Sequence, residues 1–226
     1  MKKFALAVVT AVAFAGSAHA ADLVLDPGLT APVPMAQDWT GFYAGVFGGY
    51  GSGSVSYVSG GVTNSVPIGG FLGGGAAGYN QQWDHFVLGA EGDIAWSNLT
   101  GSKALGAGVT LHSNNGWQGT LRGRAGVVFD PVPVLFFATA GLAAGGLTTS
   151  ATGIAGATPY SATQIGWTAG VGVEGKVTDQ LSLKLEYAYT DLGTTTIPAG
   201  ALAPGSLAVT SHPTFQSVKL GANWHF

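Results

Sequence analysis

Eight segments of this sequence alternate apolar and polar residues with a period of two, and each is about ten residues long. They cover approximately residues 40–51, 69–82, 86–97, 116–129, 134–146, 164–176, 181–191 and 214–226. Alternation over that length is typical of β-strands whose two faces meet different surroundings. Eight such strands in one chain can pair into a sheet that closes on itself.

The connections between these segments alternate between short and long. The short ones are residues 83–85, 130–133 and 177–180, and the long ones are residues 52–68, 98–115, 147–163 and 192–213. None of the ten prolines falls inside a predicted strand, as expected where every strand is paired on both sides. Short turns at one rim and long loops at the other are typical of outer-membrane barrels, and an even number of strands brings both chain ends to the periplasmic rim.

The composition also favours a membrane. Charged residues make up 8% of the chain, whereas soluble domains carry about a quarter, and 46% of the residues are hydrophobic. The longest apolar stretch, 132–147, is interrupted by proline and glycines and is shorter than the roughly 20 residues of a spanning helix. The closed barrel is the other structure that satisfies every backbone group in lipid. We therefore predict an all-β fold, an eight-stranded antiparallel transmembrane β-barrel with short periplasmic turns and long extracellular loops.

The N-terminus has the features of a secretory signal. Lys2 and Lys3 precede an apolar stretch, and residues 18–20 form an A-x-A cleavage site. We expect a signal peptide at 1–20, cleaved between Ala20 and Ala21 after export through the Sec pathway. Residues 21–38 would form a flexible periplasmic tail and residues 39–226 the barrel, in the cell outer membrane of a Gram-negative bacterium.

Several classes of function find no support in the sequence. The absence of cysteine removes disulfides and thiolate chemistry, and eight Lys and Arg residues are too few for a nucleic-acid face. Gly170 to Gly175 match G-x-G-x-x-G, but they lie in an alternating strand and not before a helix that could hold phosphate. Asp84 and His85 are adjacent, but the sequence offers no convincing nucleophile to complete a catalytic set with them. We expect no enzymatic activity, no catalytic residue, no cofactor and no metal site.

The alternation assigns each face of the clearer strands. In residues 181–191, the leucines and tyrosines at odd positions oppose Ser182, Lys184 and Glu186 at even positions. The lipid-facing side of a membrane barrel is apolar, so the polar face lines the lumen. The segments at 40–51, 69–82 and 134–146 are glycine-rich or apolar on both faces, and their parity stays open.

Eight charged residues fall on the lumen face by this assignment. They are Glu91, Asp93, Arg122, Arg124, Glu174, Lys184, Glu186 and Lys219. An eight-stranded barrel has an interior that side chains fill, and an isolated buried ion is very costly. We therefore predict a plug of ion pairs, with Glu91 and Asp93 near the two arginines and Glu186 near Lys219. The alternative is that each charge sits in lumen water at a strand end.

Glycines on the same faces would leave room for the long charged side chains. They are Gly89, Gly166, Gly170, Gly172 and Gly221. The alternative is that they permit local bending and twist of the strands.

Six stretches resemble alphaproteobacterial small outer-membrane β-barrel proteins, the outer-membrane immunogenic or porin family. They are residues 38–45 (DWTGFYAG), 48–51 (GGYG), 73–82 (GGGAAGYNQQ), 119–126 (GTLRGRAG), 170–174 (GVGVE) and 218–226 (VKLGANWHF). The resemblance implies an OmpA-like eight-stranded barrel with surface-exposed loops. It also implies that the last residue, Phe226, is presented to the barrel-assembly machinery as an assembly signal. Some relatives are described as haemin-binding.

The leading hypothesis is a structural, surface-exposed barrel that contributes to envelope integrity. Its partners would be outer-membrane lipid, the assembly machinery and a possible host or envelope ligand at the loops, with no nucleic acid. One alternative is a narrow porin for small solutes. Another is binding of haem or a host ligand through outer loops that carry His112 and His212. A soluble lipocalin-like barrel would need an apolar lumen and a polar exterior, the reverse of the predicted charge placement.

Overall fold

The computed structural model describes residues 38–106, 108–129 and 133–226 and contains strands but no helix in these ranges. The strands are β1 (Gly41–Ser59), β2 (Val62–Trp83), β3 (Phe86–Gly106), β4 (Val109–Val128), β5 (Val134–Thr152), β6 (Tyr160–Lys176), β7 (Leu181–Asp191), β8 (Thr195–Ile197) and β9 (Val209–His225). No helix in the described residues is long and apolar enough to cross a membrane. The expected signal peptide, its cleavage site between Ala20 and Ala21, and the tail up to residue 37 lie outside the described residues.

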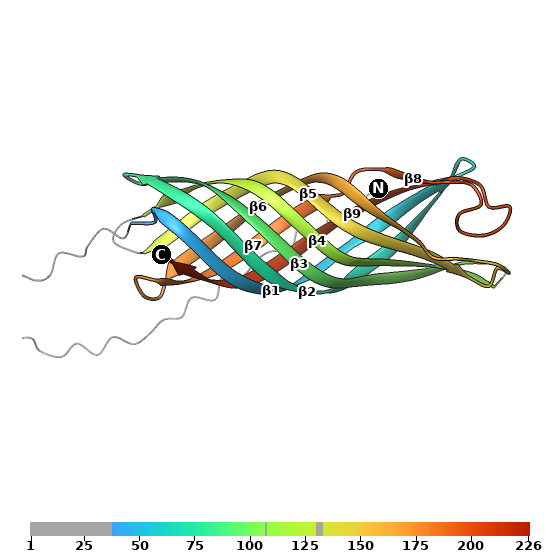
Figure 1. Cartoon of the computed structure of the whole chain (residues 1–226), viewed down its shortest axis with the longest axis horizontal. Helices are drawn as coiled ribbons and strands as arrows, with labels where there is room; N and C mark the ends of the chain where they lie inside the picture. Colours follow the sequence, from blue (N-terminus) through green and yellow to red (C-terminus); the bar gives the residue numbers. More distant parts are fainter. Residues whose placement is uncertain (1–37, 107, 130–132) are drawn as a thin grey trace, which may run out of the picture. The chain divides into compact units, whose positions relative to one another are not determined.

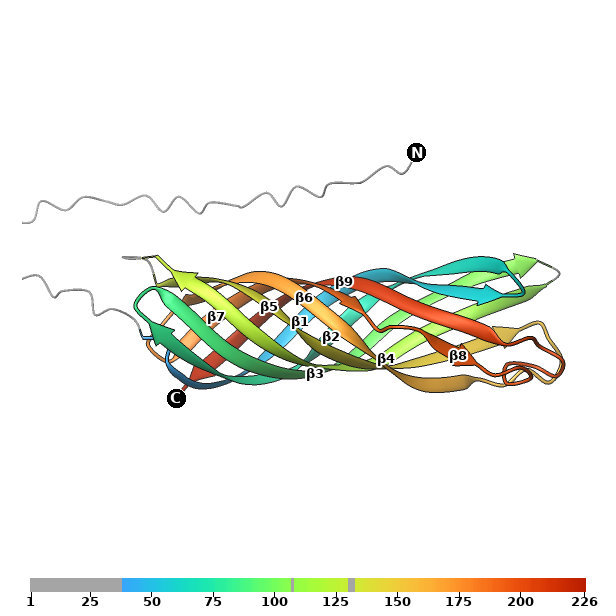
Figure 2. The same ribbon diagram turned by 90° about the horizontal axis from the view of Figure 1, so that it is seen from above.

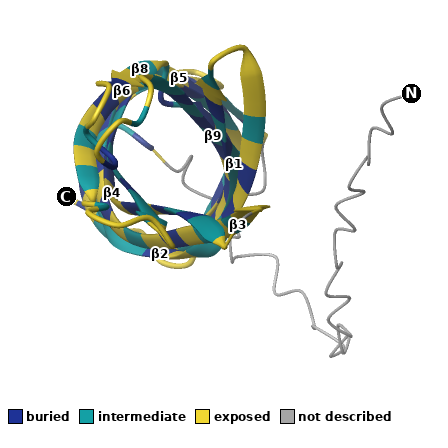
Figure 3. Ribbon diagram, turned by 90° about the vertical axis from the view of Figure 1, so that its right-hand side faces the viewer, coloured by how far each residue is buried: buried dark blue, intermediate teal, exposed yellow. Residues whose placement is uncertain are grey.

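Eight of these strands form a closed antiparallel ring (Figures 1 and 3). Neighbours along the chain pair from β1 to β7, β7 pairs with β9, and β9 pairs with β1 over Tyr43 to Val58. The ninth strand, β8, pairs only with β9, at the end of the barrel where the long connections lie. Closure leaves no exposed sheet edge around the ring. The prediction of an eight-stranded antiparallel barrel is confirmed.

The faces assigned from the sequence agree with the burial of the side chains. Lipid-facing residues such as Leu88, Leu121 and Leu185 are exposed, and their neighbours along each strand are buried or partly buried. The structure also settles the three uncertain strands. Phe42 and Val46 in β1, Phe71 in β2 and Phe136 in β5 point outward.

The long connections are more ordered than the sequence suggested. Residues 52–68 and 98–115 were predicted to be loops, but most of them extend β1–β2 and β3–β4 as paired hairpins. Several strands therefore reach 19 to 22 residues, well beyond the 9–11 that cross a bilayer. The barrel continues as a β-structured extension on its outer side (Figures 1 and 2).

Two prolines correct the expectation that none lies inside a strand. Pro67 pairs with Ser54 within β2, and Pro213 pairs with Val55 within β9. Beyond Gly69, β2 is paired on one side only, and Pro213 falls between the stretches of β9 that pair with β7 and with β8. Each proline thus sits where its missing N–H costs the sheet no hydrogen bond.

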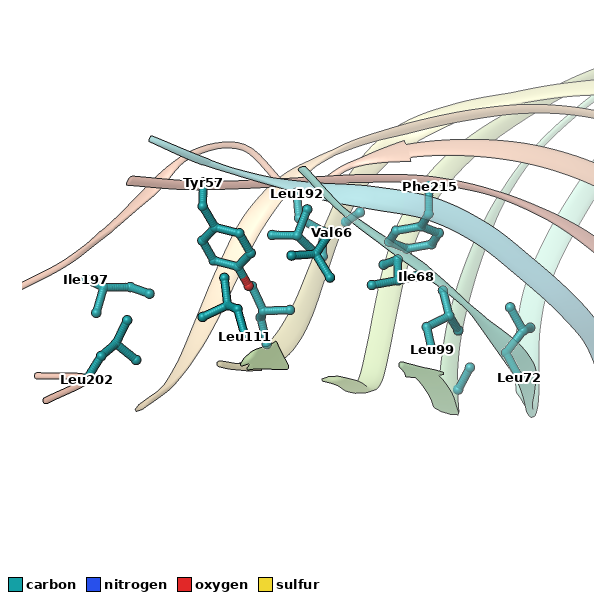
Figure 4. Close-up of a cluster of buried hydrophobic side chains, with 14 of the residues drawn as sticks. Tyr57, Val66, Ile68, Leu72, Leu99, Leu111, Leu192, Ile197, Leu202 and Phe215 are labelled. Carbon is teal, nitrogen blue, oxygen red and sulfur yellow. The ribbon is translucent and has the colours of Figure 1, made fainter. Parts of the chain in front are cut away.

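The extension consists of two four-stranded sheets. Pairing between β2 and β3 stops at Gly69 and Thr100, and pairing between β6 and β7 stops at Trp167 and Asp191. Beyond these points the register links β8–β9–β1–β2 on one side and β3–β4–β5–β6 on the other. Apolar side chains from both sheets, among them Tyr57, Leu111 and Phe215, form a buried cluster between them (Figure 4).

Candidate functional site in the barrel interior

The eight charged residues singled out in the sequence all lie inside the barrel, and each is 9% exposed or less. They come from five strands: Glu91 and Asp93 from β3, Arg122 and Arg124 from β4, Glu174 from β6, Lys184 and Glu186 from β7, and Lys219 from β9. Four acids and four bases balance one another formally. Because a buried ion is stable only when it is paired and hydrogen-bonded, the contacts among these groups decide what the interior can do.

Arg122 is the centre of the network. Its guanidinium donates to Glu186 through Nη1, and its Nη2 lies 2.5 Å from Glu91 Oε1 and 2.9 Å from Asp93 Oδ2. Nη1 also donates to the hydroxyl of Thr139 at 3.2 Å. A planar guanidinium has five N–H donors in a fixed fork, which lets one side chain bridge several carboxylates. Arg122 therefore ties β3 and β7 to β4 through the middle of the barrel.

Glu91 receives donors from two further strands, β7 and β1. Lys184 Nζ lies 2.7 Å from its Oε2, and the hydroxyl of Tyr43 donates to the same oxygen at 2.9 Å. Arg124 Nη1 lies 4.0 Å from Oε2. In the strand order, β7 and β3 are diametrically opposite in the ring, so the Lys184–Glu91 pair crosses the whole interior.

Arg124 and Glu174 form a second centre nearer the periplasmic end. Arg124 Nη2 donates to Glu174, whose other oxygen accepts from Ser182 Oγ at 2.5 Å and from Asn223 Nδ2 at 2.7 Å. The guanidinium carbon of Arg124 stands 4.0 Å from the ring centroid of Phe137. A desolvated cation over an aromatic face adds to the attraction of the carboxylate.

The ion pairs include contacts across the interior that were not predicted from the sequence. Lys219 is the register partner of Glu186 on the neighbouring strand, but its ion pair is with Asp93 across the interior, at 3.6 Å. Arg124 makes its shortest ion pair with Glu174 of β6 and a longer one, at 4.0 Å, with Glu91 of β3. Contacts across the interior thus complement those between adjacent strands.

Glycine stands opposite most of the large charged side chains. In register, Gly141 faces Arg122, Gly89 faces Arg124, Gly172 faces Glu186, Gly221 faces Lys184 and Gly49 faces Lys219. A Cβ at Gly141 would lie 2.1 Å from the carbonyl oxygen of Leu121. Of the inward glycines named from the sequence, Gly166 and Gly170 face no charged partner in their registers.

Trp39 closes the periplasmic side of the interior. Its side chain is buried beside Val87, Val128 and Leu135 and packs edge-on against the ring of His225, with 5.6 Å between centroids. Its backbone N–H donates to Gln82 Oε1 at 2.9 Å. The residue that the sequence placed at the start of the barrel therefore lies inside its mouth.

The outer side of the interior is filled by the apolar cluster between the two extension sheets, which the sequence did not predict. Val55, Val66, Leu99, Leu147 and Phe215 are each at most 3% exposed. A small polar centre lies within it, where the Tyr57 hydroxyl bonds Ser113 Oγ at 2.7 Å and Thr149 Oγ1 at 2.9 Å. From the periplasmic side to the outer side, the described interior thus has three sections: an aromatic mouth, an ionic network and an apolar cluster.

The two loop histidines do not form a joint site. His112 lies in β4 and His212 in β9, strands on opposite sides of the ring, and each alternates with inward-facing neighbours. His212 Nε2 is 2.8 Å from Asp191 Oδ1, and His112 Nε2 is 3.2 Å from Thr152 Oγ1. Within the described ranges, no group of three or more His, Cys, Asp or Glu residues is placed to hold a metal ion.

A closed ring of eight strands with an apolar outer face and a charged interior defines a transmembrane β-barrel of the outer-membrane type. The family model described as outer membrane protein beta-barrel domain matches residues 5–226. The chain belongs to this family, and its location is the cell outer membrane.

Named relatives agree with this membership. The chain is 34% identical over 248 residues to the 31 kDa outer-membrane immunogenic protein of Brucella melitensis biotype 1, with 100% of both chains covered. It is 37% identical over 161 residues to the 22 kDa outer membrane protein of Rhizobium leguminosarum bv. viciae, covering 71% of this chain and 68% of the relative. The resemblance inferred from the sequence motifs is confirmed.

Among solved structures, the outer membrane protein OprG from Pseudomonas aeruginosa matches 83% of this chain and 97% of its own, with 14% identity and a TM-score of 0.45.

Proposed function

We propose that this protein is a closed, non-enzymatic structural barrel that contributes to the integrity of the outer membrane and carries a surface-exposed β-extension. The observation that carries this proposal is the buried network centred on Arg122, which contacts Glu91, Asp93 and Glu186. Side chains that hold one another across the interior fill the space that a solute would need.

The apolar cluster supports the same function and weighs against a narrow porin. Leu99, Leu147 and Phe215, from three different strands, are buried together on the outer side of the charged network. A solute would have to pass this dry section as well as the ion pairs. Moving an ion into such a section is very costly.

Reconstituted protein is therefore expected to give no steady ohmic conductance in planar bilayers. Insertion is verified by protease protection of the bilayer-embedded strands, and a general porin in the same membranes serves as the positive control. The Lys103→Glu variant changes a charge at an outer hairpin and is also expected to give no steady conductance. Long-lived, ohmic openings from the pure wild-type protein would contradict the closed barrel and favour the porin.

A surface role is supported by the length of the extension and by the names of the relatives. Hairpins that continue past the bilayer, such as the one joining β1 and β2, are accessible from outside. The Brucella relative is named an outer-membrane immunogenic protein, and we infer that the extension is the surface antigen of this protein. A host or envelope ligand would meet the molecule there. The separation of His112 and His212 weighs against their joint ligation of haem.

We also propose that Phe226 is read by the barrel-assembly machinery. The side chain is 80% exposed, and its backbone N–H bonds the carbonyl of Phe42 at 3.0 Å, so the aromatic ring is presented beside the first strand. Interior packing does not account for an aromatic ring so exposed.

Deleting Phe226 is therefore expected to lower the amount of folded barrel in the outer membrane while export continues. Heat-modifiable gel mobility measures the folded fraction, and periplasmic accumulation of the mature chain measures export. The matched control is Phe129→Ala, which removes another exposed aromatic ring, 58% exposed, near a periplasmic turn. Equal folded yield for the deletion and the wild type would refute the role of Phe226.

A further inference from the structure

The outward face of the sheet β3–β6 changes its chemistry where the extension begins. Within the bilayer its outward residues are apolar, as at Ile94 and Leu121, whereas beyond the paired Trp96 and Trp117 they carry hydroxyl and amide groups. These polar outward residues are Asn98, Thr100, Ser102, His112, Asn114, Thr148, Ser150, Ser161 and Thr163. A hydroxyl-rich, uncharged band thus follows directly after the aromatic residues.

Two adjoining hollows mark this band. One, of about 270 Å³, is lined by Trp117, Gly146, Asn114, Thr148 and residues of β6. The other, of about 420 Å³, continues from Asn114 and Thr148 toward His112 and Ser150. Because they share Asn114 and Thr148, they form one groove that runs along the outer surface of the sheet. Among the residues that the structure describes, no Lys, Arg, Asp or Glu lines either hollow.

Trp117 forms one end of the groove. Its indole lies over Gly146 on the neighbouring strand, where a Cβ would come within 2.3 Å of Nε1. The side chain is 37% exposed, whereas its register partner Trp96 is 71% exposed and lines neither hollow. The lack of a side chain at position 146 therefore lets the indole lie against the strand at the end of the groove.

This combination suits one kind of ligand. Asn, Ser and Thr side chains can both donate and accept hydrogen bonds, which matches the hydroxyl groups of a sugar. An indole offers a flat apolar face for the C–H face of a pyranose ring, together with one N–H donor. The absence of cations along the groove disfavours recognition through phosphate or carboxylate.

We propose that the groove from Trp117 to Ser150 binds the uncharged saccharide part of the glycolipid that forms the outer leaflet around the barrel. Aromatic residues of membrane barrels lie at the boundary between hydrocarbon and headgroups. The groove begins at such a residue and leads away from the bilayer along the extension. A sugar attached to a lipid anchor would therefore meet the groove without leaving its leaflet.

The experiment uses full-length protein extracted from outer membranes in mild detergent and then stripped of bound lipid. Its probes are purified lipopolysaccharide that retains its neutral outer sugars, added in nanodiscs, and the delipidated oligosaccharide released from the same material. Native mass spectrometry counts bound glycolipid, and calorimetry measures the affinity for both probes. We expect saturable binding of the glycolipid, and weaker binding of the free oligosaccharide because it lacks the anchor.

Four variants decide whether the groove is responsible. Trp117→Ala and the double variant Asn114→Ala/Thr148→Val are each expected to lower glycolipid affinity about tenfold or more. Gly146→Ala leaves every polar group in place but displaces the indole, and a similar loss is expected. Trp96→Ala, the matched control across the register, should bind as the wild type does. Heat-modifiable mobility confirms that each variant is folded.

Three results would overturn the inference. Wild-type affinity in Trp117→Ala and in the double variant would show that the groove is not the binding site. Equal losses of glycolipid affinity in Trp96→Ala and Trp117→Ala would show that aromatic residues at the membrane boundary have this effect in general, and that the groove is not specific. Free oligosaccharide bound as tightly as the anchored glycolipid would assign the groove to soluble glycans and not to the surrounding leaflet.

Discussion

Replacing Arg122 by methionine is expected to destabilise the barrel by about 3–5 kcal/mol, the range seen when one partner of a buried ion pair is removed. Arg122 contacts three carboxylates, on Glu91, Asp93 and Glu186, and its side chain is 1% exposed. Methionine fills much of the same volume but leaves these acids without their shared cation. The measurement is the free energy of unfolding from urea titrations in lipid vesicles.

Two further variants isolate the electrostatic part of this loss. Leu121→Ala removes the lipid-facing neighbour on the same strand and tests the general sensitivity of β4 to truncation. Combining Arg122→Met with Glu186→Gln removes one of the uncompensated acids, so part of the lost stability should return. A loss below about 1 kcal/mol in Arg122→Met would mean that water, and not the arginine, solvates these carboxylates.

The bilayer part of the fold could be predicted because its two faces meet very different surroundings. In β7, Leu183 and Leu185 alternate with Lys184 and Glu186, and only one arrangement keeps the charges out of lipid. The same reasoning placed Lys219 on the interior face of β9. Charges are the residues that lipid tolerates least, so a few of them fix the parity of a whole strand.

The extension could not be predicted because the two faces of its strands exchange their polarity where the extension begins. The outward face becomes polar and the inward face becomes apolar, although residues still alternate between the two faces. In β1, outward Val46 and Tyr50 are followed by outward Ser54, whereas inward Gly49 is followed by inward Val55. A pattern that changes sign within one strand resembles the end of that strand. The Gly- and Ser-rich composition of residues 52–68 reinforces the impression of a loop, although hydroxyl side chains suit a sheet face in water.

Only some partners of the charged residues could be predicted, and the reason is geometric. Register between adjacent strands follows from the alternation and the short turns, and it brings Glu91 beside Arg122. Contacts across the interior, such as Lys184 with Glu91 and Arg122 with Glu186, depend on how far the strands are staggered around the ring. That stagger is a property of the closed barrel and leaves no local pattern in the sequence.

Truncating Phe215 to alanine is expected to cost about 3–5 kcal/mol, although the residue lies on the outer side of the ionic network. Its side chain is 2% exposed in the cluster between the two extension sheets (Figure 4). Gly53 faces it in register and has no side chain that could fill the resulting cavity. Because backbone pairing between the two sheets stops at β2–β3 and β6–β7, side-chain contacts hold the sheets together in this part of the chain. These contacts are the apolar cluster and a few side-chain hydrogen bonds, such as those from Tyr57 to Ser113 and Thr149.

This dependence on packing also predicts where the variant will change. Hydrogen exchange should accelerate in the outer half of β9, which contains Phe215, and in the outer half of β1, which pairs with it, while the bilayer part around Arg122 keeps its protection. Val218→Ala, on the lipid face of the same strand, is the matched control and should alter neither region much. Uniform acceleration along all strands would show that the barrel and its extension unfold as one unit. Unchanged exchange and stability would mean that the hairpins keep their sheets in place without any contribution from the cluster. With the expected result, the extension is a second packed core built on top of the barrel, and the interior is closed by two independent means.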